Sequence, residues 1–115
     1  MGILRPEWNE VEATTRVLVL GELAKCKVHI AHVTLPECVS IIDTYRQRTG
    51  GQVSCEVTGH HFTLTSKLYA EHLFKEDLVM APPLQRPEKV EGMKKMLVDG
   101  KIDCTCSDHC PYTRS

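Results

Sequence analysis

Hydrophobic and polar positions along the chain follow two patterns, one with a helical period and one typical of short buried strands. Residues 7–24 carry apolar side chains at helical spacing, which predicts an amphipathic helix. The positions on this stripe are Ala13, Val17, Leu20 and Ala24. Residues 28–33 are instead β-branched and mostly apolar over a short length, so they predict a buried strand.

Helices and strands are expected to alternate through the rest of the chain. Thr34 and Glu37 match a Thr-x-x-Glu capping box, with Pro36 in the first turn. A second helix should therefore start there and stop at Gly50. The later elements are, in order, a strand over 52–58, a short helix over 66–74, a short extended piece at 78–80, a helix that starts at Pro87 and ends at Asp99, and a strand over 102–107.

This order predicts an α/β fold in which parallel strands are joined by right-handed crossovers. In such sheets the carboxyl ends of the strands share one edge, where ligands bind. Three polar clusters fall at these strand ends: His32, His60 with His61, and Asp108 with His109. His32 and Asp108 are candidate metal ligands, and Asp108 is also a candidate proton carrier. Each has a structural alternative, because a strand-end His often bonds to backbone and an Asp before a turn often caps a helix.

The composition is that of one small globular domain or of a piece of a larger one. The chain has 115 residues, 42% hydrophobic and 25% charged, so wholesale disorder is not expected. A net charge of −1 gives no basic excess, so nucleic acid is not an expected partner. The longest apolar run, residues 17–20, is too short to cross a membrane, and the N-terminal stretch lacks a signal-peptide core. We expect a cytoplasmic protein with no membrane partner.

Six cysteines leave three alternatives open. A disulfide framework needs a secretory context, which the sequence does not indicate. Cys55, Cys104 and Cys106 lie in predicted strands and fit buried thiols. A compact zinc site is the remaining alternative, although structural zinc sites usually pair two separated ligand couples. Its ligands would be Cys104, Cys106, His109 and Cys110.

Five blocks of residues stand in order along nearly the whole chain. They are Arg5-Pro6-Glu7 with Glu10 and Glu12, the stretch from Leu23 to Thr34, the stretch from Glu56 to Thr65, Pro82-Pro83-Leu84, and Asp99 to Asp103 followed by Ser107 to Pro111. Together these blocks resemble the cyclic amidohydrolases, the family of dihydroorotase, allantoinase and dihydropyrimidinase (hydantoinase). Each block is weak alone, but five in register make the resemblance specific.

The resemblance implies a (β/α)8 TIM-type barrel of which residues 1–115 are a fragment, about the sixth to eighth strands with their helices. A whole barrel takes roughly 250 residues, so this chain would not complete one. The resemblance also implies two zinc ions at the carboxyl face. His32 would be the zinc ligand of the sixth strand, and Asp108 a zinc ligand that moves a proton from hydroxide to the leaving nitrogen. Glu56, His60 and His61 would lie on the seventh strand, which is close to the metals in some dihydroorotases. They are further candidate metal ligands, and the alternative is that they support the ligands or the fold.

The other metal ligands of the family have no counterpart in the sequence. The chain contains no His-x-His pair, and no residue can be assigned to the bridging lysine or to the fifth-strand histidine. We therefore expect the isolated chain to be inactive, and to associate with itself or with the remainder of a barrel. The parent activity would be zinc-dependent hydrolysis of a C–N bond in a small cyclic amide or ureide. A catalytically inactive amidohydrolase-like scaffold is the alternative.

The substrate is expected to be of the dihydroorotase type, which would place the protein in pyrimidine biosynthesis. The block 56–65 supports this prediction, but two expected substrate-binding positions depart from that pattern. Ala81 stands where dihydroorotases have an Asn, and Tyr112 stands where they have a His that helps to hold a carboxylate. Residues 107–112 instead resemble dihydropyrimidinases, and residues 81–83 resemble allantoinases, so both remain alternatives.

Overall fold

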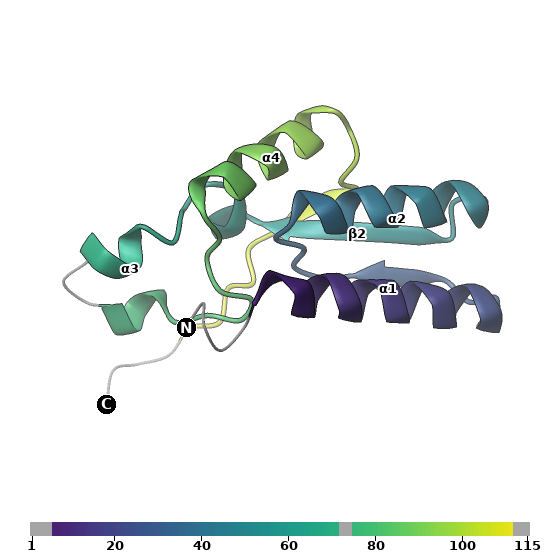
Figure 1. Cartoon of the computed structure of the whole chain (residues 1–115), viewed down its shortest axis with the longest axis horizontal. Coiled ribbons are helices and arrows are strands. Elements are labelled where there is room, and N and C mark those ends of the chain that lie inside the picture. The colour runs from purple at the N-terminus through teal and green to yellow at the C-terminus, as the bar shows by residue number, and fades with distance from the viewer. Residues whose placement is uncertain (1–5, 72–74, 112–115) are drawn as a thin grey trace.

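Figure 1 shows the protein as a computed structural model, which describes residues 6–71 and 75–111. The elements are, in order, α1 (Glu7–Ala24), β1 (Val28–Ile30), α2 (Pro36–Arg48), β2 (Val53–Thr58), the 3-10 turn η1 (Gly59–Phe62), α3 (Leu68–Glu71), the 3-10 turn η2 (Lys75–Leu78), α4 (Pro87–Val98) and β3 (Cys104–Cys106). The predicted alternation of helices and strands is confirmed. The extended piece predicted at 78–80 is wrong, because η2 ends at Leu78 and the two residues after it belong to no strand.

The three strands form a parallel sheet in the order β1-β2-β3, as the alternation predicted. His29 on β1 is level with Ser54 on β2, and Glu56 on β2 is level with Cys104 on β3. Because the strands run in the same direction, their carboxyl ends meet at one edge of the sheet. Residue clusters that follow β1, β2 and β3 are therefore brought to the same end of the molecule.

The hydrophobic core lies between one face of the sheet and the helices. Along β2 the buried side chains are Val53, Cys55 and Val57, which alternate with the less buried Ser54 and Glu56. They pack with helical side chains that include Leu18, Val39, Ile42 and Met93. Figure 1 shows α1 and α2 lying beside each other along the sheet, with α4 above the beginning of α2. The opposite face of the sheet carries polar and sulfur-containing side chains, which makes it the face available for chemistry.

Helix α1 spans the predicted residues but buries a different side from the predicted stripe. Its buried residues are Thr14, Leu18 and Gly21, whereas Val17 and Leu20 are 44% and 59% exposed. The helix is apolar on more than one side, so periodicity alone did not identify the side that packs. Gly21 decides the packing, because its missing side chain lets α1 approach Val28 of β1.

The predicted capping box at the start of α2 is wrong, although the helix begins at Pro36 close to the expected place. Glu10 of α1 takes the capping role instead. Its carboxylate accepts hydrogen bonds from the backbone N–H groups of Thr34 (2.8 Å) and Leu35 (3.2 Å), and from the Thr34 hydroxyl. Glu37 forms an ion pair with Lys89 of α4. The cap therefore joins α1 to α2, which a local sequence motif could not indicate.

Among the described residues, no helix is both long enough and apolar enough to cross a membrane.

Candidate functional site

His32 and Asp108 lie together at the carboxyl edge of the sheet, directly after β1 and β3. The distance between His32 Nε2 and Asp108 Oδ1 is 3.6 Å. Both residues have a left-handed backbone conformation, with φ of 55° and 49°. Such a conformation is uncommon for residues other than glycine and often marks a functional position. The two turns aim the imidazole and the carboxylate at each other from the two edge strands of the sheet.

Glu56 stands on β2 between these two strands and extends the cluster. Its Oε1 atom lies 3.3 Å from His32 Nδ1 and accepts a hydrogen bond of 3.2 Å from the Cys106 thiol. This thiol bond, together with the contact to His29, holds the pKa of Glu56 below its ordinary value. Partial burial and the nearby carboxylate raise the pKa of the Cys106 thiol to about 11. The donor atoms of His32, Glu56 and Cys106 all lie within 4.8 Å of one another, which is compact enough to hold a metal ion.

His61 is held away from this cluster by contacts of its own. It is 2% exposed, with Nδ1 2.6 Å from Thr58 Oγ1 and Nε2 2.8 Å from the carbonyl oxygen of Pro82. Burial lowers the pKa of His61 to about 4, so the imidazole is neutral at physiological pH. Both ring nitrogens are therefore occupied, and His61 joins the end of β2 to the loop that contains Pro82.

His60 packs on His61 and lies within electrostatic reach of the candidate site. The centroids of the two imidazole rings are 4.4 Å apart. Partial burial lowers the pKa of His60, while the Asp108 carboxylate raises it and His32 lowers it further. The charges of His32 and Asp108 therefore act on both histidines of the predicted seventh-strand pair.

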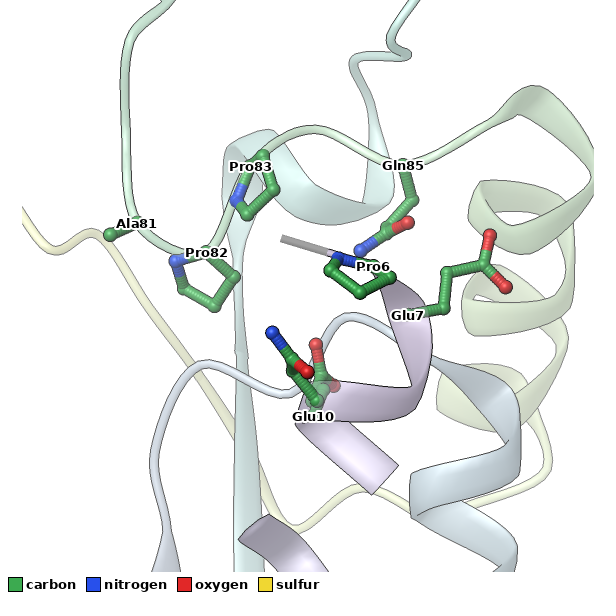
Figure 2. A pocket seen from close by; sticks show the side chains of 8 residues that line it. Pro6, Glu7, Glu10, Ala81, Pro82, Pro83 and Gln85 are labelled. Atoms are coloured by element: carbon green, nitrogen blue, oxygen red, sulfur yellow. The ribbon is translucent and has the colours of Figure 1, made fainter. Parts of the chain in front are cut away.

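A pocket of about 560 Å³ lies beside the start of α1 (Figure 2). Its lining residues are Pro6, Glu7, Asn9, Glu10, Ala81, Pro82, Pro83 and Gln85. Figure 2 shows the segment 81–85 arching over the first turn of α1, with Ala81 at one end of the arch and Gln85 at the other. Gln85 donates a hydrogen bond of 3.0 Å to Thr34 Oγ1, which ties the arch to the start of α2. Of the two predicted substrate-binding residues, Ala81 borders this pocket, and Tyr112 lies outside the described residues.

The cysteines follow the sequence-based interpretation only in part. Cys55 is buried as predicted, but Cys104 is exposed and Cys106 is half-buried. The reason is the alternation of β3 and β2, which turns Cys104 and Cys106 to the polar face. The described residues form two compact His/Glu/Cys groups, and neither includes His109 or Cys110. The zinc site suggested for residues 104–110 is therefore not formed.

Sequence reasoning missed His29, which lies on β1 three positions before His32. Its Nε2 atom is 3.3 Å from Glu56 Oε2. The signal that could have found it is the two-residue period of strands, which places His29 and Glu56 on the same sheet face once the strands are aligned.

Comparisons with known proteins agree with this geometry. The allantoinase of Escherichia coli (strain K12) is 40% identical over 109 residues, covering 93% of this chain. The solved D-hydantoinase (dihydropyrimidinase) of a Thermus species superimposes with a TM-score of 0.86 at 27% identity, covering 96% of this chain. The chain belongs to the cyclic amidohydrolase family. No protein-family model matches it.

This amidohydrolase chain spans about a quarter of the proteins that it resembles. It covers 23% of the E. coli allantoinase and 24% of the Thermus D-hydantoinase. The dihydropyrimidinase of Brevibacillus agri gives a TM-score of 0.81 at 28% identity, and there the match covers 90% of this chain and 23% of that one. The parallel sheet with its helices on one face is accordingly part of a (β/α)8 barrel, as predicted.

Proposed function

We propose that this chain forms the part of an amidohydrolase barrel that carries His32 and Asp108, and that the complete barrel hydrolyses a C–N bond of a cyclic amide or ureide. The observation that carries the proposal is the 3.6 Å approach of His32 to Asp108 at the carboxyl ends of two parallel strands. Active sites of (β/α)8 barrels lie at this end of the strands. The similarity to allantoinases and hydantoinases supports the reaction class.

The donor atoms at this edge fit a divalent metal ion. His32 offers its Nε2 atom, and Asp108 offers a carboxylate oxygen 3.6 Å away, a pair that suits zinc. We propose that His32 and Asp108 are metal ligands, and that ligands from other strands of the barrel complete the site. When bound, zinc would lower the pKa of a water molecule and polarise the scissile carbonyl.

Asp108 has the position that a proton carrier needs. Its side chain is half-exposed at the sheet edge, and its Oδ1 atom faces the His32 imidazole. Ring opening requires that the attacking water lose a proton and that the amide nitrogen, a poor leaving group, gain one. We propose that the Asp108 carboxylate takes the first proton and delivers it to the nitrogen. Glu56, on the other side of His32, orients the imidazole through Nδ1.

The pocket beside Ala81 bears on the choice of substrate. The Ala81 methyl group offers no hydrogen bond to a substrate carboxylate, and the acidic lining residues Glu7 and Glu10 are already engaged, Glu7 in an ion pair with Arg86 and Glu10 as a hydrogen-bond acceptor at the start of α2. An uncharged ring, of the kind that allantoinases and dihydropyrimidinases act on, therefore fits this pocket better than a carboxylated one. The dihydroorotase-like specificity stays a prediction that the same experiment tests.

A chimera tests this proposal, because the chain aligns with a defined quarter of a complete enzyme. The matching region of the E. coli allantoinase would be replaced by this chain, and the purified zinc-loaded chimera would be assayed by chromatography. The panel would contain allantoin, hydantoin, dihydrouracil and dihydroorotate. We expect ring opening of an uncharged substrate. Turnover of dihydroorotate alone would contradict the specificity, and a folded, metal-loaded chimera without any turnover would favour an inactive scaffold.

A further inference from the structure

A second group of donor atoms lies on the polar face of the sheet, below the His32–Asp108 edge. It consists of His29, Glu56 and Cys104, one from each strand. We propose that this group is a binding site for a thiophilic divalent cation such as Zn²⁺ or Cd²⁺, separate from the hydrolytic site and not required by the proposed reaction.

The distances within the group are close to those of a metal site. His29 Nε2 lies 3.3 Å from Glu56 Oε2, and Cys104 Sγ lies 4.0 Å from the same oxygen. All three donor atoms lie within 4.8 Å of one another. Bond lengths of 2.0–2.3 Å in a tetrahedral zinc site put neighbouring ligand atoms about 3.3–3.8 Å apart. The His–Glu spacing already matches this range, and the distance from the thiol to the same carboxylate oxygen is slightly longer than the range.

Ser54 orients the histidine for this role. Its hydroxyl lies 2.8 Å from His29 Nδ1, level with His29 in the strand register. In the tautomer that donates Nδ1–H to Ser54, the Nε2 lone pair points toward Glu56 and is free for a cation. Histidine ligands commonly have such a hydrogen-bond partner on the other nitrogen, and it fixes both the tautomer and the ring plane.

The two oxygens of Glu56 face different groups, which keeps the two sites distinct. Oε1 is turned to His32 and Cys106, whereas Oε2 is turned to His29 and Cys104. Both His29 and Cys104 are exposed in the 115-residue chain, so a cation can reach them there. Nitrogen, oxygen and sulfur donors together select zinc and softer ions over Mg²⁺ or Ca²⁺. Binding replaces the thiol proton of Cys104, which is released to solvent.

Differential alkylation of the unmodified 115-residue chain tests the proposal with cadmium as the probe. Cys104 and Cys110 are both exposed, and only Cys104 belongs to the group, so Cys110 is an internal control. The rate of alkylation of each cysteine is measured by peptide mass spectrometry. We expect Cd²⁺ to slow the alkylation of Cys104 at least tenfold and to leave the rate for Cys110 unchanged. Equal rates for Cys104 with and without Cd²⁺, or equal protection of both thiols, would overturn the proposal.

Cadmium titrations of variants add a measurement of affinity. The variants are made in a Cys106→Ser background, and binding is read from the thiolate-to-cadmium ultraviolet band. His29→Gln should weaken cadmium binding at least tenfold, and Ser54→Ala should weaken it by about 10–100-fold. Cys26→Ser, which removes an exposed thiol elsewhere, should leave the affinity unchanged. An unchanged affinity in His29→Gln would refute the site.

Asp108→Asn separates this site from the proposed function. We expect this substitution to leave Cd²⁺ binding at Cys104 unchanged, whereas it should slow hydrolysis by the chimera by about 10²–10⁴-fold. Loss of Cys104 protection in a folded Asp108→Asn chain would contradict the independence of the two sites.

Discussion

Glu10 and His61 are residues whose side chains join segments far apart in the sequence around the candidate site. Glu10 accepts three hydrogen bonds at residues 34 and 35, and partial burial raises the pKa of its carboxyl group. His61 joins Thr58 to the Pro82 carbonyl. Removing such a side chain lowers the stability of the fold, because the polar atoms that it was bonded to lose their hydrogen bonds in a place that water reaches poorly.

Replacing Glu10 with alanine should destabilise the start of α2. The substitution leaves the N–H groups of Thr34 and Leu35 without their acceptor, so we expect Glu10→Ala to lower the free energy of unfolding by about 1–3 kcal/mol. Glu12→Ala is the matched control on the same helix. It removes an exposed pair with Arg16 and should cost less than about 1 kcal/mol. Urea unfolding measures both, and equal effects would contradict the capping role of Glu10.

The stability of the chain should fall on acidification because of His61. Burial lowers its pKa from 6.5 to about 4, so the unfolded chain binds more protons between these values. We expect the free energy of unfolding to decrease as the pH falls through this window, by up to roughly 3 kcal/mol, since one pKa unit corresponds to about 1.4 kcal/mol. Urea unfolding of His61→Gln should show a flatter pH profile of stability than the wild-type chain. The control His109→Gln, at an exposed position, should keep the wild-type profile. The account of His61 is wrong if His61→Gln keeps the wild-type slope.

At the scale of elements, periodicity predicted most of the helices and strands, but not the contacts between them. The 7–24 helix was found with its correct bounds, yet its packing side was not, because Val17 and Leu20 are as apolar as buried Leu18. The start of α2 was placed well, but its cap comes from Glu10, 24 residues away. Local sequence patterns identify helices and strands, whereas the side of a helix that packs depends on which other elements lie next to it in the fold.

The same limit applies to the candidate site. His32 and Asp108 could be predicted because both follow strands, and parallel strands bring their carboxyl ends together. The closeness of His29 and Cys104 to Glu56 could not, because the strand register that sets Glu56 level with Cys104 is a property of the folded sheet. A polar residue within a strand gives no signal of its neighbours until that register is known.

The close packing of α1 on β1 depends on Gly21. A methyl group at this position would lie 2.3 Å from Val28 Cγ2. Although alanine is the better helix former by about 1 kcal/mol, we expect Gly21→Ala to destabilise the chain by roughly 1–3 kcal/mol in thermal or urea unfolding.

Val28→Ala removes the carbon atom that the new methyl group would meet and is therefore the matched second substitution. The double variant Gly21→Ala/Val28→Ala should lose less stability than the two single variants added together. Strict additivity, or a stabilising Gly21→Ala, would show that this contact does not control the packing.

The molecule as a whole has surfaces that a closed barrel would cover. Among the described strands, β1 and β3 each pair with β2 alone. The exposed side of α1 carries large apolar residues, with Leu20 59% and Leu23 76% exposed. Open sheet edges and exposed apolar side chains promote association. This agrees with a chain that matches 23% of an allantoinase.

We therefore predict that the isolated chain self-associates through α1. Leu20→Lys should weaken this association about tenfold or more, because an exposed apolar contact is replaced by a charge. Val98→Lys is the control, since Val98 is 86% exposed on α4, away from that side. Sedimentation velocity over a range of concentrations measures both variants. A wild-type chain that stays monomeric at every concentration would contradict the prediction.

The central claim is that Asp108 and His32 act in one hydrolytic site, and the allantoinase chimera tests it most directly. Asp108→Asn keeps the shape of the side chain but removes its capacity to take a proton, so the rate of ring opening should fall by about 10²–10⁴-fold. Asp99→Asn, at the end of α4, should leave the rate unchanged. Ring opening by the Asp108→Asn chimera at the rate of the unsubstituted chimera would contradict the account.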